Sequence, residues 1–159
     1  MKKAVLFELL CSVLLVGILA AVLYEKPVKD VPLSAVEAAF AGRSDFRTME
    51  KFGAMTLRRN LSLDEADLPE YLYYGQSDTM AVQVFFVAKS ASETVREAVS
   101  KAVDRYLERE KKAYLGYGAS QTALLNDARI VKAGDYVAFI VSADADAWEA
   151  EFRSLITEE

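Results

Sequence analysis

The chain has 159 residues, a net charge of −5 at neutral pH, no histidine and a single cysteine, Cys11. An acidic surface disfavours nucleic acid as a partner, because the phosphate backbone rewards clustered Lys and Arg. The absence of histidine removes the commonest general base and metal ligand, and a lone cysteine excludes a disulfide framework.

Residues 4–24 form an almost unbroken apolar run that follows two lysines. At a rise of about 1.5 Å per residue, a helix of this length reaches across a bilayer core of roughly 30 Å. We therefore predict a signal-anchor transmembrane helix over residues 1–24 that contacts membrane lipid through residues 4–24. Cleavage after Ala20 or Ala21, which would give a secreted form, is the alternative, but the apolar run continues beyond both residues.

The flanks of this run predict the side on which the rest of the chain lies. Basic residues flank the run on both sides, but the N-terminal flank is very short, which favours a C-terminal domain that faces outward. Glu8 is the one charged residue inside the run, and it either leans toward the lipid headgroups or contacts a polar group of another membrane helix. Cys11 is not preceded by a small residue, so we interpret it as an apolar residue and not as a lipid-accepting cysteine.

Beyond the predicted anchor, the chain divides into a spacer and one domain. Residues 25–32 contain two prolines and alternating charges, and we interpret them as a short spacer. Residues 33–159 suffice for one hydrophobic core and contain no internal repeat or low-complexity segment. We therefore expect one extracytoplasmic domain, held at the outer side of the cell membrane.

The first part of this domain has helical spacing. Ser34 and Glu37 have the spacing of a capping box, which predicts a short helix over residues 35–41. Apolar residues recur at helical intervals over residues 45–60, which predicts a second helix. Residues 64–69 are acidic and end at a proline, so we interpret them as a turn.

Four segments have the composition of strands: residues 71–74, 80–89, 130–133 and 136–142. The segment 80–89 has apolar residues on both faces, which predicts a central strand covered on both sides or a face reserved for a partner. Gly134 and Asp135 separate the last two segments and predict a tight hairpin, in which glycine supplies a positive φ.

Two further helices complete the predicted domain. Ser90 and Glu93 have the spacing of a second capping box, at the start of a long helix that we expect to end near Leu115. A last amphipathic helix is expected to end near Ile156. The buried stripe of the long helix consists of Val95, Val99, Ala102, Val103 and Tyr106. Two pairs of strands separated by a long helix predict an α+β fold, in which an antiparallel sheet of about four strands is backed by helices.

No group of residues in the predicted domain has the spacing of a known catalytic or metal site. The only thiol lies in the apolar run, and neither a nucleophile turn nor a phosphate-binding glycine loop occurs in the sequence. The acidic clusters around Asp64 and Asp144 lack the ligand spacing and the glycine of a calcium loop, so we interpret them as a solvated turn and a helix N-terminus. We therefore expect a non-enzymatic protein without a cofactor.

Tyrosines gather near the first predicted strand and near the end of the long helix. Tyrosine combines an aromatic face with a polar tip, so such a group can bind a sugar or a protein partner. The alternative is that these tyrosines pack against the edge of the sheet, where tyrosine is common. The candidate ligand or partner surface consists of Tyr71, Tyr73, Tyr74, Tyr114 and Tyr117.

Three stretches carry a resemblance to a known family: residues 68–75, residues 81–89, and the hairpin from Ile130 to Ser142 with the acidic helix start behind it. From about Met55 onward, the chain resembles a bacterial domain family of unknown function, whose members are membrane-anchored or lipidated extracytoplasmic proteins, chiefly of Gram-positive bacteria. The chain differs from the lipidated members because it lacks a lipid-accepting cysteine, which favours a retained helix. The resemblance implies an envelope protein that works beside cell-surface polysaccharide machinery, and it supplies no catalytic residues.

An anchor joined to a domain without a catalytic constellation predicts a membrane-anchored extracytoplasmic module that binds or assembles with another protein of the bacterial cell envelope. Two alternatives stay open. One is a cell-surface domain that binds a small molecule or glycan through its tyrosines, and the other is an enzyme that uses carboxylates alone.

Overall fold

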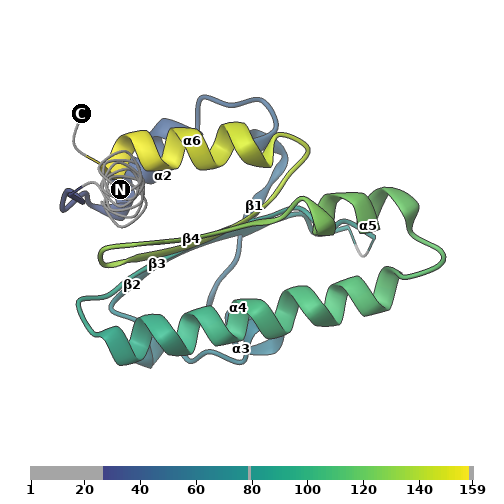
Figure 1. The fold of residues 1–159 in the computed structure, drawn as a ribbon, viewed down its shortest axis with the longest axis horizontal. Helices are drawn as coiled ribbons and strands as arrows, with labels where there is room; N and C mark the ends of the chain where they lie inside the picture. The colour runs from purple at the N-terminus through teal and green to yellow at the C-terminus, as the bar shows by residue number, and fades with distance from the viewer. Residues whose placement is uncertain (1–26, 79, 158–159) are drawn as a thin grey trace, which may run out of the picture.

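Five strands form one antiparallel sheet in the computed structural model, which describes residues 27–78 and 80–157 (Figure 1). The strands lie side by side in the order β1-β2-β3-β5-β4. They are β1 (Glu50–Lys51), β2 (Glu70–Gly75), β3 (Val84–Lys89), β4 (Arg129–Ala133) and β5 (Tyr136–Val141). The predicted α+β fold is confirmed, and the sheet has five strands rather than about four because a short edge strand, β1, pairs with β2.

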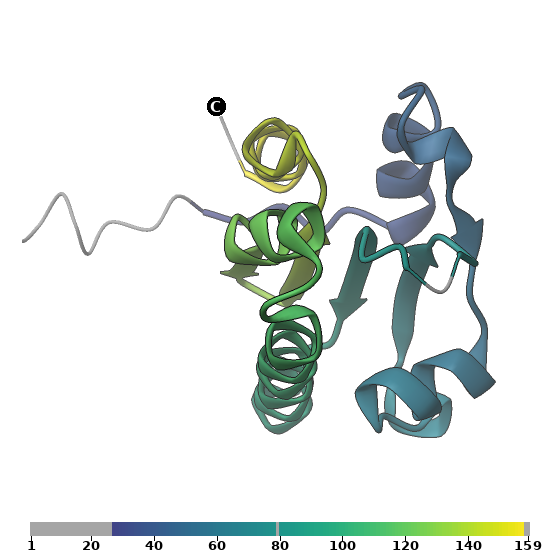
Figure 2. The ribbon, with the colours of Figure 1, turned by 90° about the vertical axis from the view of Figure 1, so that its right-hand side faces the viewer.

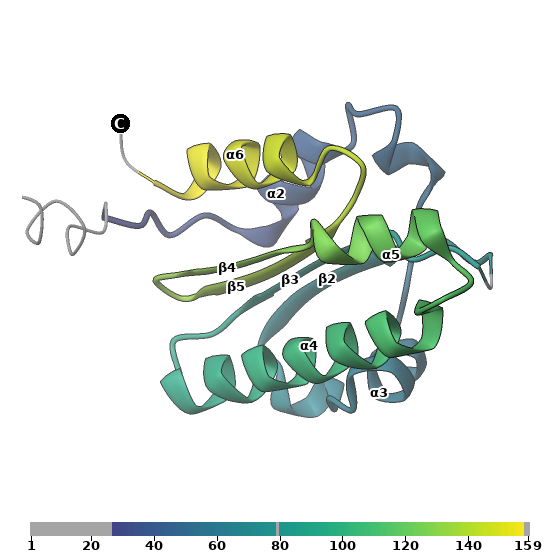
Figure 3. The ribbon, with the colours of Figure 1, turned by 45° about the vertical axis from the view of Figure 1, so that its right-hand side comes forward.

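Helices cover both faces of this sheet (Figures 2 and 3). In the described residues the helices are α2 (Leu33–Phe40), α3 (Ala54–Leu61), α4 (Glu93–Tyr114), α5 (Ala119–Asn126) and α6 (Ala145–Ile156), with short 3-10 turns at η1 (Phe46–Thr48) and η2 (Glu65–Asp67). One face packs against α2 and α6 and is called the α6 face below. The opposite face packs against α3, α4 and α5 and is called the α4 face.

The central strand β3 contributes side chains to the hydrophobic cores on both faces of the sheet. Successive side chains of a strand point to opposite faces. Phe85 and Val87 are therefore buried on the α6 face, whereas Val84 and Phe86 are buried on the α4 face. The prediction that this strand is covered on both sides is confirmed.

The predicted helix over residues 45–60 is wrong, because this segment passes from one face of the sheet to the other. Asp45 accepts a hydrogen bond from the N–H of Phe46 (3.0 Å) and starts η1, after which the chain extends into β1. Phe46 packs on the α6 face and Phe52 on the α4 face, so no single helix can bury both. The helix α3 begins only after Gly53.

Both predicted capping boxes are also wrong. The Ser34 side chain does not cap α2, which follows Pro32 directly, and the φ of proline is already suited to a helix start. The N–H of Ser90 donates to the carbonyl of Asp135 (2.9 Å), which holds Ser90 at the end of β3. Its hydroxyl accepts from the N–H of Ser92 (3.2 Å) and does not cap α4.

The strand predicted over residues 80–89 begins only at Val84, because a turn precedes it. In that turn the N–H of Ala81 donates to the carbonyl of Asp78 (3.1 Å). The predicted hairpin is confirmed, with Gly134 at a φ of +51°. The long helix and the last helix are confirmed as well, since α4 and α6 end within about one residue of the predicted positions.

Residues 28–31, which we call the strap, lie along one end of the sheet. Val28 forms an isolated bridge with Thr157. The hydroxyl of Tyr136 accepts from the N–H of Val31 and donates to the carbonyl of the same residue, both at 2.7 Å. The strap therefore fixes the chain beside the β4–β5 hairpin, at the end of the sheet opposite to the β2–β3 connection.

In the part of the chain that the structure describes, no helix combines the length and the apolar character needed to span a bilayer. The predicted anchor over residues 1–24, with Glu8 and Cys11, lies outside the described residues, and so do residues 25 and 26 of the predicted spacer.

Candidate functional site

The five tyrosines selected from the sequence lie in three different places. Tyr71 and Tyr73 lie on the α4 face of β2, whereas Tyr74 lies on the α6 face, because side chains alternate along the strand. The rings of Tyr114 and Tyr117 lie 5.7 Å apart at the end of α4. The structure therefore brings Tyr114 and Tyr117 together and separates Tyr74 from its two neighbours in the sequence.

Two of the strand tyrosines bond to nearby carboxylates. The hydroxyl of Tyr71 donates to Glu65 (2.8 Å), and burial and this carboxylate raise the pKa of Tyr71 to about 12. The hydroxyl of Tyr74 donates to Glu37, which also accepts from Lys51 (2.8 Å). These contacts explain Tyr71 and Tyr74 as parts of the fold. Tyr73 differs from both, because it is only 1% exposed and lines a cavity.

Three cavities have α4 as part of their wall. A groove of about 610 Å³ lies between α4 and the segment 62–68. A hollow of about 260 Å³ lies between the first half of α4 and the β4–β5 hairpin. A cavity of about 340 Å³ lies between α3, the second half of α4 and the ends of β2 and β3. We call this last cavity the tyrosine pocket, and its main wall residues are Phe52, Asn60, Tyr73, Gln83, Tyr106 and Glu110.

Hydrogen bonds from α3 and α4 stabilise the walls of the tyrosine pocket. The side-chain amide of Asn60, in the last turn of α3, donates to the hydroxyl of Tyr73 (2.9 Å). Arg109 of α4 donates to the carbonyl of Asn60 (3.1 Å), which ties the end of α3 to the long helix. The guanidinium of Arg109 also lies over the ring of Tyr106, 5.0 Å from its centroid.

Glycine permits the close approach that places Phe52 in the wall. A Cβ atom at Gly75 would lie 2.5 Å from the ring of Phe52, so a larger residue there would displace the ring. In its observed position, the ring of Phe52 meets the ring of Tyr73 edge to face, with centroids 5.2 Å apart. The packing of Phe52 against Tyr73 and Gly75 of β2 therefore forms this part of the wall without a ligand.

The hydroxyl groups in the pocket have unused hydrogen-bonding capacity. Tyr106 is only 8% exposed, and its hydroxyl forms no hydrogen bond with any residue in 27–78 or 80–157. The hydroxyl of Tyr73 accepts from Asn60, and no described residue accepts its own proton. Two phenols that line one cavity and have free donor or acceptor capacity mark it as a candidate ligand site.

Both phenols are electrically neutral at ordinary pH. Burial raises the pKa of Tyr106, and the nearby phenol of Tyr73 raises it further. Burial also raises the pKa of Tyr73, although the hydrogen bond from Asn60 opposes this change. A phenol with a raised pKa holds its proton, so these two groups serve as hydrogen-bond donors and acceptors and not as bases.

Sequence reasoning missed Tyr106 as a site residue. Its helical spacing placed it in the buried stripe of α4, which is correct for its ring. No local signal shows that its hydroxyl meets Tyr73, because the two residues belong to separate elements. Their proximity depends on how α4 packs against the sheet, where it contacts β3 and β5.

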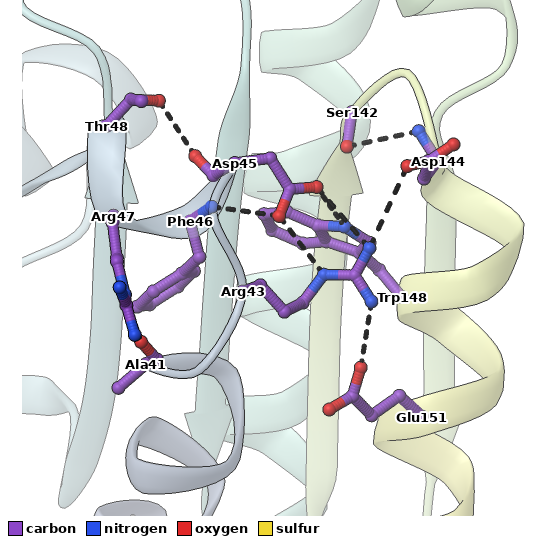
Figure 4. A network of polar contacts seen from close by, with 10 residues as sticks. All are labelled: Ala41, Arg43, Asp45, Phe46, Arg47, Thr48, Ser142, Asp144, Trp148 and Glu151. Carbon is purple, nitrogen blue, oxygen red and sulfur yellow. Dashed lines mark hydrogen bonds and ion pairs between the residues drawn. The ribbon is translucent and has the colours of Figure 1, made fainter.

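A second polar network lies on the α6 face and joins the start of η1 to α6 (Figure 4). Arg43 donates to Asp45 (3.2 Å) and to Glu151 (3.0 Å), and the indole N–H of Trp148 donates to Asp45 (2.9 Å). The guanidinium of Arg43 lies 5.2 Å from the centroid of the Trp148 ring. The groups of this network satisfy one another, so we interpret it as a structural joint.

The acidic clusters considered for calcium bond to protein groups. Asp64 pairs with Arg58 and accepts from the N–H of Ala66 (3.2 Å). Asp144 lies 3.8 Å from Arg43, and Asp146 pairs with Arg129. Among the described residues, no three acidic or thiol side chains come together in a way that could hold a metal ion.

Comparison with known proteins identifies a family. Residues 43–142 match the family model described as "Domain of unknown function (DUF4358)". None of the curated proteins and none of the solved structures matches the chain. The matched range includes all five strands and the six main wall residues of the tyrosine pocket, and it leaves out α2 and α6.

Proposed function

Since the chain belongs to the DUF4358 family, whose description assigns no activity, we propose from its own geometry that it is a membrane-anchored, non-enzymatic binding domain of the bacterial cell envelope. Its ligand site is the tyrosine pocket. The observation that carries this proposal is the hydroxyl of Tyr106, which faces the pocket and bonds to no described residue, although the residue as a whole is only 8% exposed.

The free hydrogen-bonding capacity of Tyr106 supports a binding role. The hydroxyl of Tyr106 is not among the fully enclosed side-chain atoms, so water that enters the pocket can bond to it. Phenylalanine would therefore fill the same place in α4 with about equal stability. Since the fold does not use this hydroxyl, its donor and acceptor are available to a bound ligand.

The chemistry of the wall supports binding rather than catalysis. The raised pKa values of Tyr73 and Tyr106 keep both phenols protonated, which disfavours their use as general bases. Glu110 pairs with Arg109 (3.2 Å), so the nearest carboxylate is already bonded. The groups in the pocket are suited to orienting a ligand by hydrogen bonds.

The position of the strap supports an anchored domain. The strap is the described segment that follows the predicted transmembrane helix in the sequence, and it lies at one end of the sheet, whereas the tyrosine pocket lies at the other end, beside the β2–β3 connection. An anchor in the bilayer would place the β4–β5 hairpin near the membrane. The pocket would then face away from it.

Membrane attachment and orientation are tested with the full chain produced in bacterial cells. We expect the protein to stay in the membrane fraction after an alkaline wash, and we expect protease added to spheroplasts to digest the domain. A variant that lacks residues 1–24 should be soluble and protected inside the same spheroplasts. Release by the alkaline wash, or protection of the full chain, would refute the anchored, outward-facing arrangement.

A second candidate function, assembly with another envelope protein, is favoured by the groove between α4 and the segment 62–68. Apolar side chains such as Leu68 and Val99 form its floor, and charged side chains such as Asp67 and Lys101 form its rim. A mixed surface of this kind is suited to a protein partner.

This second function is tested by purifying the full chain from detergent-solubilised membranes. A partner seated in the groove should be lost with Val95→Asp and kept with Asp104→Asn, since Val95 lines the groove and Asp104 is an exposed residue of the same helix that does not. Equal recovery of a partner by both variants would place the binding surface elsewhere.

A further inference from the structure

We infer that the tyrosine pocket takes a neutral, hydroxyl-rich ligand of the size of a monosaccharide. This inference rests on the proposed function, because it names the ligand class of the same site. It is carried by three properties of the wall: its unused hydrogen-bonding capacity, its balanced charge and its aromatic surface.

The unused capacity of the wall matches groups that both donate and accept. A tyrosine hydroxyl donates one proton and accepts through its oxygen, and a ligand hydroxyl does the same. The hydroxyl of Tyr106 is free for both roles, and that of Tyr73 is free to donate because Asn60 supplies its accepted bond. A phosphate or a carboxylate would only accept, and an ammonium group would only donate.

The charged groups around the pocket are balanced and already bonded. Glu110 pairs with Arg109 (3.2 Å), and Arg59 donates to the side chain of Asn60 (3.3 Å). Asp78 accepts from the N–H of Met80 (2.8 Å). A charged ligand would therefore give up its hydration without gaining a dedicated counter-ion, which is unfavourable in a cavity.

Aromatic rings supply the apolar part of the wall. Three rings from separate segments of the chain line one cavity: those of Phe52, Tyr73 and Tyr106. Binding sites for small molecules combine such apolar surface with a few fixed polar groups. The ring of a sugar has the same combination, since its C–H faces are apolar and its edge carries hydroxyls.

The volume and the position of the pocket agree with this class. About 340 Å³ is at the lower end of the range of roughly 300–1,000 Å³ for ligand pockets, which suits one sugar ring and not a chain of them. The pocket lies at the end of the sheet away from the strap, so in the proposed arrangement its ligand reaches it from the side facing away from the bilayer.

The test uses the full chain in micelles of a detergent without a sugar headgroup, because a maltoside would compete for the site. Binding is measured by saturation-transfer NMR with three probes of similar size: glucose as the neutral polyol, glucose 6-phosphate as the anion and cyclohexylmethanol as the largely apolar compound. We expect glucose to bind with a Kd on the order of 1 mM and the other two to bind at least about tenfold more weakly.

Variants that keep the fold assign this binding to the pocket. Tyr106→Phe removes only an unpartnered hydroxyl, so it should leave the unfolding midpoint unchanged and weaken glucose binding about tenfold. Tyr117→Phe is the matched control, because Tyr117 is 70% exposed and lies outside the pocket wall, and it should leave binding unchanged.

Three outcomes would overturn the inference. Equal binding of glucose by Tyr106→Phe would show that the pocket is not the site. Tighter binding of glucose 6-phosphate or of cyclohexylmethanol, lost in Tyr106→Phe, would refute the ligand class and leave the proposed ligand site standing. Absence of binding by all three probes would refute both the ligand class and the pocket, while membrane attachment is decided by the separate protease experiment.

Discussion

The two faces of the sheet use their residues differently. On the α6 face, Phe40, Phe46, Phe85 and Trp148 form a cluster in which ring centroids lie 4.4–6.0 Å apart. Polar groups at the edge of this cluster bond to one another through Asp45. The α6 face is therefore filled and satisfied.

The α4 face is less completely filled. Its cavities border α4, and two of its hydroxyls, the buried one of Ser100 and the pocket-facing one of Tyr106, bond to no described residue. Stability favours full packing and full hydrogen bonding, so departures from both on the α4 face agree with the binding role that we propose for it. The comparison predicts large mutational effects on the α6 face and small ones at the polar groups of the α4 face.

The largest expected effect comes from Trp148→Ala, which should lower the free energy of unfolding by about 3–5 kcal/mol. Trp148 is fully buried, and its removal would leave a cavity among the rings of the α6 face. The measurement is chemical denaturation of the full chain in micelles, followed by circular dichroism because Trp148 is the only tryptophan.

The matched variant on the other face is Tyr106→Ala. Its ring already borders a cavity, so its removal should cost at least about 1 kcal/mol less than Trp148→Ala. Equal losses would contradict the difference in packing between the two faces.

The next effect concerns the strap, which packs against the β4–β5 hairpin. Alanine at Gly134 would hold a φ of +51° and place a Cβ atom 2.9 Å from Val28, so Gly134→Ala should cost about 2 kcal/mol. Gly116→Ala is the control, because its φ of +92° is also unfavourable but nothing lies within 4 Å, and it should cost about 1 kcal/mol.

A double-mutant cycle isolates the contact with the strap. In a Val28→Gly background, Gly134→Ala should cost no more than Gly116→Ala, because the clashing side chain is gone. A cost at Gly134 that does not depend on Val28 would show that the strap does not hold this end of the sheet in solution.

A smaller and pH-dependent effect is expected at Asp45. Burial alone would raise the pKa of Asp45, but the hydrogen bonds from Arg43 and Trp148 outweigh it and hold the pKa below its usual value of 3.8. Asp45→Asn weakens these bonds and should cost about 1 kcal/mol at pH 7.

The lowered pKa of Asp45 determines the sign of the pH dependence. A carboxyl whose pKa is lowered by folding stabilises the protein above its ordinary pKa and loses that contribution as the pH falls through the lowered value. The difference between wild type and Asp45→Asn should therefore be full at pH 7 and shrink below about pH 4. Asp146→Asn, at a side chain 80% exposed, should change stability little at either pH, and a constant difference for Asp45→Asn would refute the role given to its charge.

The sequence predicted those parts of the fold whose signals are local. The stripe of α4 and the glycine of the hairpin depend on a few neighbouring residues, and both are confirmed. The segment 45–60 was predicted wrongly because its apolar residues have helical spacing in the chain, although Phe46 and Phe52 pack on opposite faces of the sheet. Only the position of the sheet shows this.

The candidate site could be predicted only in part for a similar reason. Tyr73 belonged to the tyrosine surface proposed from the sequence, but Tyr106 was assigned to the core and Asn60 to a helix. These three residues line one cavity because α3 packs against α4 on the face of the sheet to which Tyr73 points, and no spacing in the sequence encodes that packing. The burial of Tyr106 was predictable, whereas its unpartnered hydroxyl was not.

The smallest expected effect tests whether an unpartnered hydroxyl contributes to stability on the α4 face. The side-chain oxygen of Ser100 is buried and bonds to no described residue. Alanine also favours a helix more than serine does, by about 0.5 kcal/mol. Ser100→Ala should therefore leave the free energy of unfolding unchanged or raise it by up to about 1 kcal/mol.

Ser142→Ala is the matched control, because both serines are about equally buried but the hydroxyl of Ser142 accepts from the N–H of Asp144 (3.2 Å). Loss of that bond should cost about 1 kcal/mol, so in the same denaturation Ser142→Ala should lower the free energy of unfolding and Ser100→Ala should not. A cost for Ser100→Ala as large as that for Ser142→Ala would mean that the Ser100 hydroxyl has a partner in solution. The contrast between a satisfied and an unsatisfied face would then rest on Tyr106 alone.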